Sequence, residues 1–154
     1  MKFKLNYLVI PLLVIAVGAV GSMFTGSWMA WYTTLSLPQW TPPGSFIWMV
    51  WTIIYACSII SLLLFRQTKH DKKFTLILRL FIINGLLNAF WNRFFFVQHR
   101  LLFSLIVIIV LFILTVTKMI LLYPRSKSAS LFLLLYPIWL VIAGSLAYGI
   151  WILN

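Results

Sequence analysis

Five long apolar runs constrain the fold of this chain more than any other feature of its sequence. A membrane-spanning helix needs about 20 mostly apolar residues, whereas a strand of a membrane barrel is shorter and alternates. With 64% hydrophobic and 8% charged residues, the chain also lacks the polar coat of a soluble domain. The sequence therefore predicts an all-α integral membrane protein, a single domain over residues 1–154 with five transmembrane helices. The predicted spans cover about residues 5–25, 45–65, 75–97, 101–122 and 131–153.

The charges of the chain are almost all positive, with a net charge of +11 and Asp71 as the single acidic residue. The cations lie in short clusters between apolar runs, which indicates orientation in a membrane and no nucleic-acid partner. With five spans, one side of the membrane receives most of them. This bias predicts a cytoplasmic N-terminus and places the loop between the first two spans outside. The cations on the predicted cytoplasmic side are Lys2, Lys4, Arg66, Lys69, Lys72, Lys73, Arg125 and Lys127.

Several kinds of chemistry are excluded by what the apolar runs lack. None contains Asp or Glu, which excludes a proton relay through carboxylates and a hydrolase with paired carboxylates. His70 and His99 lie in predicted loops without neighbouring metal ligands, so no metal site is expected. Arg79, Arg93 and Lys118 lie within a turn or two of predicted helix ends, where long cationic side chains are expected to snorkel to water.

A few residues inside the spans are unusual for membrane helices. Asn84 and Asn88 are four residues apart and share one helix face, where they either link helices or contact a ligand; spacing alone leaves both open. Trp139 lies well inside its run, where an interfacial belt does not explain it. The phenylalanines at 94–96 lie near a helix end, as is typical of such a belt. Ala143 begins a pattern of small residues that favours close helix packing.

Aromatic and proline motifs recur along the chain: WY at 31–32, LPQWTPPG at 37–44, Trp51, LNAFWNRFFF at 87–96 and Trp139. Through these motifs, and over nearly its whole length, the chain resembles the TspO/MBR family, the translocator proteins related to the peripheral benzodiazepine receptor, in its bacterial form. The resemblance implies a five-helix bundle whose ligand pocket is covered by the loop between helices 1 and 2. It also implies a bacterial cell-membrane location and a homodimer. The prolines of this loop fix φ and reduce the entropy lost on ordering it, which suits a lid.

The resemblance implies a tetrapyrrole ligand, protoporphyrin IX or haem, or another flat apolar molecule, with no cofactor required. It favours a binding protein that supports light-dependent porphyrin degradation, with Trp31 and Trp139 as the catalytic pair. It leaves open whether the protein is an enzyme, a transporter of porphyrins, lipids or sterols, or a non-catalytic stress sensor. The implied ligand-binding residues are Trp31, Tyr32, Trp40, Pro42, Pro43, Gly44, Trp51, Asn84, Asn88, Trp91, Phe95, Trp139 and Ala143.

Overall fold

The computed structural model describes residues 6–27 and 29–154, with side chains from residue 10 onward apart from residues 27 and 28. Within this part of the chain every regular element is a helix. The elements are α1 (Asn6–Ser27), α2 (Met29–Tyr32), α3 (Gly44–Phe65), α4 (Lys72–Asn92), the π-helical turn η1 (Arg93–Val97), α5 (Leu101–Leu122), α6 (Lys127–Phe132) and α7 (Leu135–Leu153). Lys2, Lys4 and the first residue of the span predicted at 5–25 lie outside the described residues.

Four helical segments are long and apolar enough to cross a membrane: Gly44–Phe65, Lys72–Val97, Leu101–Leu122 and Lys127–Leu153. In α1, the apolar stretch with described side chains is shorter, Ile10–Gly26, and the helix continues through Pro11. The four segments lie close to the ranges predicted from the sequence, so the protein is a helical integral membrane protein. A fifth span through α1 stays a prediction.

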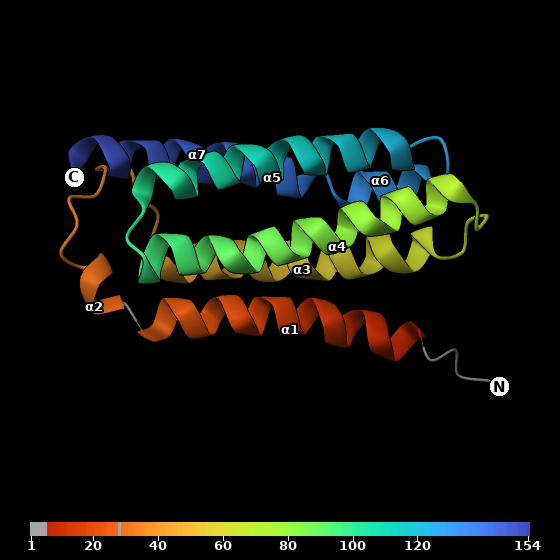
Figure 1. The fold of residues 1–154 in the computed structure, drawn as a ribbon, viewed down its shortest axis with the longest axis horizontal. Helices are drawn as coiled ribbons and strands as arrows, with labels where there is room; N and C mark the ends of the chain where they lie inside the picture. The colour runs from red at the N-terminus through yellow and green to blue at the C-terminus, as the bar shows by residue number, and fades with distance from the viewer. Residues whose placement is uncertain (1–5, 28) are drawn as a thin grey trace.

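The long helices lie side by side as a bundle (Figure 1). Helix α1 lies along one edge and packs on α3 and α4, while α5 packs on α4, α6 and α7. The short helix α2 and the C-terminus lie at the same end of the bundle (Figure 1). This end also holds the start of α3 and of α5, and we call it the α2 end.

The last predicted span, at 131–153, is interrupted where the sequence analysis expected a continuous helix. Helix α6 ends at Phe132 and α7 begins at Leu135. Pro137 has no N–H to donate to the carbonyl one turn earlier, which favours a break at this point. Tight bonds replace the regular pattern, from Leu134 N to Leu131 O and from Tyr136 N to Leu133 O, both 3.0 Å.

The end of α4 also departs from a regular helix. The backbone N–H of Gln98 donates to Arg93 O at 3.0 Å, which closes the wider π turn of η1. The chain then reverses at His99, whose φ of 53° lies in the left-handed region. Phe95 and Phe96 are 3% and 8% exposed. The expectation of an interfacial belt is therefore wrong for these two rings, which face the protein.

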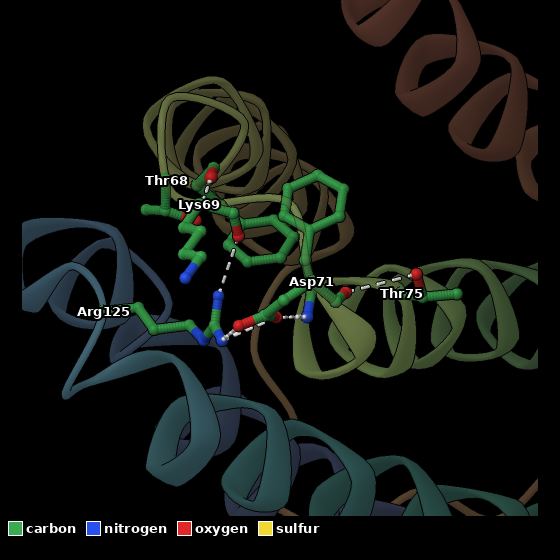
Figure 2. A network of polar contacts seen from close by, with 7 residues as sticks. Thr68, Lys69, Asp71, Thr75 and Arg125 are labelled. Atoms are coloured by element: carbon green, nitrogen blue, oxygen red, sulfur yellow. Dashed lines mark hydrogen bonds and ion pairs between the residues drawn. The ribbon is translucent and has the colours of Figure 1, made fainter.

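At the end opposite α2, a polar network joins the α3–α4 connection to the chain that follows α5 (Figure 2). Nη2 of Arg125 lies 2.7 and 2.6 Å from the two carboxylate oxygens of Asp71, and Nη1 donates to Lys69 O at 3.0 Å. Asp71 also caps α4, because its Oδ1 accepts from Phe74 N at 2.9 Å. Hydrogen bonds from Arg125 and then from the Phe74 amide hold the pKa of Asp71 below its ordinary value of 3.8.

We expect Asp71→Asn to lower thermal stability above about pH 4, and we expect this effect to shrink as the solution becomes strongly acidic. The folded-state pKa of Asp71 is depressed, so its contribution is present above the ordinary value and is lost as the pH falls through the folded-state pKa. The measurement is the melting temperature of both proteins in detergent across a pH series. A gap between them that stays constant into strong acid would contradict this role of the carboxylate.

Candidate functional site: an aromatic cluster beneath the α2–α3 loop

Helix α2 brings two predicted site residues onto the aromatic rings of η1. The Trp31 ring stacks on His99 with centroids 3.8 Å apart and meets Phe95 edge-on at 5.8 Å. Tyr32 lies 6.2 Å from Phe95 and 5.8 Å from Phe96. Partial burial among these rings raises the pKa of the Tyr32 phenol, which keeps it neutral.

The loop that follows α2 is fixed to the last turns of α7. The backbone N–H of Ser36 donates to Asn154 Oδ1, and Asn154 Nδ2 donates back to Ser36 O, both at 3.0 Å. Pro38 packs so closely on Gly149 that a Cβ at that glycine would lie 2.7 Å from Pro38 Cγ. The loop therefore covers the α2 end of the bundle through contacts at both its polar backbone and its proline.

Trp91 connects the rings under the loop to the interior of the bundle. Its ring stacks on Phe95 with centroids 5.2 Å apart, and its Nε1 donates to Ser104 O at 3.0 Å. It also packs against a buried cluster that contains Trp139 and borders on Trp51. The Trp51 ring lies 5.8 Å from Tyr55 and 5.9 Å, edge-on, from Tyr136.

Trp139 is a buried ring of this interior cluster whose polar atom lacks a hydrogen-bond partner among the described residues. The residue is 5% exposed and lies 6.3 Å from Phe46, ring to ring. Its Nε1 is buried and has no hydrogen-bond partner among the residues that the structure describes. Buried N–H groups are almost always paired in proteins, so this donor is open to an acceptor from outside the chain.

Two groups of hydrogen-bonded polar side chains link helices next to this cluster. Tyr55 donates its hydroxyl to Asn88 Oδ1 at 2.8 Å, and Asn88 Nδ2 donates to the Tyr136 hydroxyl at 2.9 Å. Asn84 donates to Thr115 Oγ1 and accepts from Lys118 Nζ, both at 3.1 Å. In this arrangement both asparagines link helices, and each amide has protein partners on both its oxygen and its nitrogen.

Lys118 does not reach the membrane surface, so the expectation that it snorkels is wrong. It is 2% exposed, and its ammonium lies 4.4 Å from the centre of the Phe81 ring. Its position on α5 explains this, because Ser104, Leu111, Thr115 and Lys118 follow the three-to-four residue spacing of one buried face. Arg79 and Arg93, in contrast, are exposed.

Sequence reasoning missed Tyr55, Thr115, Lys118 and Tyr136 as members of these two hydrogen-bonded groups. The available signal was the spacing of the polar residues in 101–122, which places Ser104, Thr115 and Lys118 on one face. The structure does not bring every predicted residue to the cluster. Trp40, Pro43 and Gly44 are exposed, while Pro42 and Ala143 are half-buried.

The fold and the site define a class: a helical membrane protein in which a proline-rich loop covers an aromatic cluster at one end of the bundle. The TspO/MBR family model matches residues 9–152, and the chain belongs to this family. It is 36% identical over 144 residues to the tryptophan-rich protein TspO of Chlorobaculum tepidum, which covers 92% of this chain and 91% of that protein. It is 33% identical to the protein of the same name from Archaeoglobus fulgidus, over 93% of each chain. It is 27% identical to protein CrtK of Rhodobacter capsulatus, over 89% of this chain and 85% of that protein.

Proposed function

We propose that this protein binds a tetrapyrrole, protoporphyrin IX or haem, within the aromatic cluster between the α2–α3 loop and α7. The observation that carries the proposal is the unpaired, buried indole N–H of Trp139 among aromatic side chains. A flat ring with carboxylate or other acceptor groups supplies what this place lacks, since aromatic faces stack on it and the N–H donates to it.

Entry of such a ligand requires the loop to move, because the aromatic side chains beneath it pack on one another. Opening breaks the two hydrogen bonds between Ser36 and Asn154, the packing of Pro38 on Gly149, and the packing of Leu35 and Leu37 on the buried cluster at this end. Opening of a loop costs less than unfolding of a helix. The loop therefore acts as the lid of the proposed site.

The experiment is a titration of the purified protein with protoporphyrin IX in the dark, followed by its absorption and fluorescence. We expect saturable binding to the wild type and about tenfold weaker binding to Trp139→Phe, because Phe keeps a ring but loses one buried hydrogen bond. Trp48→Phe is the matched control, since Trp48 is 69% exposed on α3. Absence of saturable binding, or equal affinity in Trp139→Phe and the wild type, would contradict the proposal.

We further propose that α1 supplies a fifth span and that the α2 end faces away from the cytoplasm. The support is the cation asymmetry: Lys69, Lys72, Lys73 and Lys127 all lie at the opposite end of the bundle. The exposed residues Ser45 and Gln67 mark the two ends.

This orientation predicts opposite labelling of single cysteines at these positions after Cys57 is replaced by alanine. In intact cells, a membrane-impermeant maleimide is expected to label Ser45→Cys and to leave Gln67→Cys unlabelled until the cells are opened. The reverse pattern, or equal labelling of both in intact cells, would show that the assignment of sides is wrong.

A further inference from the structure

A cavity at the α2 end lies between the start of α5 and the end of α7. It has a volume of about 500 Å³ and is open to the surroundings. Arg100, His99 and Asn154 give it polar groups, and the rest of its lining is apolar. The apolar lining residues are Leu101, Leu102, Phe103, Ile106 and Trp151.

A second hollow continues along the same pair of helices towards the middle of the bundle. It has a volume of about 200 Å³ and lies between α5 and α7, where Leu105, Ile109 and Gly144 are among its lining residues. Ile106 lines the first cavity, and two of its neighbours on α5 line the second hollow. Leu105 is the preceding residue, and Ile109 lies about one turn further along the helix. Gly144 allows α7 to approach α5 closely beside the hollow, because a Cβ there would already lie 3.3 Å from Ile108 on α5.

The outer cavity is positively charged, which suits a lipid headgroup, whereas the inner hollow is apolar, which suits an acyl chain. The outer one carries the exposed guanidinium of Arg100, and the inner one is lined by apolar side chains and Ser145. The single acidic side chain of the chain, Asp71, pairs with Arg125 at the other end of the bundle, so no Asp or Glu side chain pairs with Arg100. Trp151, which lines the outer cavity, is the kind of side chain that lies at the headgroup level of a membrane.

We propose that the α5–α7 seam is a binding site for an anionic phospholipid. The phosphate group of the lipid lies at Arg100 in the outer cavity, and one acyl chain follows the seam into the hollow at Gly144. A guanidinium binds phosphate through a charge-assisted, often bidentate contact, which favours an anionic headgroup over a zwitterionic one. Neither hollow is lined by Trp31, Trp91 or Trp139, but the outer one adjoins the proposed tetrapyrrole site, because His99 stacks on Trp31 and Asn154 bonds to Ser36 of the loop.

The test is native mass spectrometry of the protein released from micelles that contain equal amounts of phosphatidylglycerol and phosphatidylcholine with identical acyl chains. We expect the wild type to retain phosphatidylglycerol with about a fivefold preference, and Arg100→Gln to lose that preference. Arg93→Gln is the matched control, since Arg93 is an exposed arginine near the same end that does not line the cavity.

A second pair of variants tests whether an acyl chain occupies the inner hollow. Ser145→Trp fills the inner hollow and is expected to reduce retention of both lipids, because Ser145 is exposed and bonds only within its own helix, to Val141 O. Thr52→Trp is the control, since Thr52 is equally exposed on α3 and bonds in the same way to Trp48 O. Both substitutions replace an exposed side chain that bonds only within its own helix, so the comparison separates filling of the hollow from the general effect of an added tryptophan.

Three outcomes would overturn the proposal. Equal retention of the two lipids by the wild type removes the headgroup preference. Displacement of phosphatidylglycerol by inorganic phosphate alone shows a simple anion site. Displacement by protoporphyrin IX, together with weaker porphyrin binding in Arg100→Gln, assigns the cavity to the tetrapyrrole. A phosphatidylglycerol preference that Arg100→Gln abolishes and Arg93→Gln retains supports the lipid site.

Discussion

Asn84→Leu is expected to destabilise the protein by about 3 kcal/mol, because it leaves the ammonium of Lys118 buried without its amide acceptor. Asn84 Oδ1 accepts from Lys118 Nζ at 3.1 Å, and the lysine is 2% exposed. The sequence contains no spare carboxylate that takes over this role, since Asp71 is the only acid. The measurement is chemical or thermal unfolding of the purified protein in one detergent.

The same account predicts that Lys118→Met rescues Asn84→Leu. An apolar pair of similar volume removes the unpaired charge, and replacement of buried polar groups by apolar ones is often neutral or stabilising. The double variant is therefore expected to be about as stable as the wild type, and Lys73→Met, on the exposed surface of α4, serves as the control for loss of a lysine. If Asn84→Leu is harmless, or if Lys118→Met fails to rescue it, the buried contact does not stabilise the bundle as described.

The second large effect is expected on the rate at which bound porphyrin is bleached by light. Trp31→Phe and Trp139→Phe should each slow the bleaching of bound protoporphyrin IX several-fold under illumination. An excited porphyrin stacked on indole exchanges an electron with it or passes energy to oxygen, and Phe keeps most of the packing while being much harder to oxidise. The protein supplies positioning and exclusion of water. This prediction rests on the proposed tetrapyrrole site.

The readout is the loss of the porphyrin absorption band at equal occupancy of the ligand, with affinity measured alongside in the dark. Trp48→Phe controls for loss of a tryptophan from a position exposed on the outside of the bundle. Bleaching at the wild-type rate in Trp31→Phe and Trp139→Phe, with ligand bound, would show that tryptophan chemistry is not involved.

Much of the helical framework follows from the sequence, because length and apolar composition determine it. The run at 101–122 became α5 with the same bounds, and 45–65 became α3, which begins one residue earlier behind Pro43. The span at 131–153 was wrong as a continuous helix. Pro137 was visible in the sequence, but proline is tolerated in many membrane helices, so its presence alone does not fix a break.

The candidate site was harder to predict because it depends on which way side chains face. Lys118 lies near a helix end, and its flexible stem reaches either water or the bundle. Only the packing of α5 on α4 decides between them, by burying the face that carries Thr115 and Lys118. Phe95 and Phe96 point inward because the π turn of η1 shifts their register, which the sequence pattern did not indicate.

The family motif around Trp40 predicted the family better than it predicted the site. Its residues are the most specific in the sequence, yet Trp40 is 53% exposed. The prolines beside it instead fix where α3 begins, since Phe46 N and Ile47 N both donate to Pro43 O. A motif identifies a family more readily than it identifies which of its side chains touch a ligand.

The most direct measurement is a map of light-driven oxidation in the protein with protoporphyrin IX bound, obtained by peptide mass spectrometry. Exposed tryptophans are ordinarily oxidised first, so Trp48, at 69% exposure, should react before Trp139, at 5%, if the sensitiser is not bound beside it. The proposed site predicts the reverse, with Trp139 and Trp31 oxidised ahead of Trp48. Oxidation of Trp48 or Trp151 first, with Trp139 intact, would contradict a tetrapyrrole site beneath the α2–α3 loop.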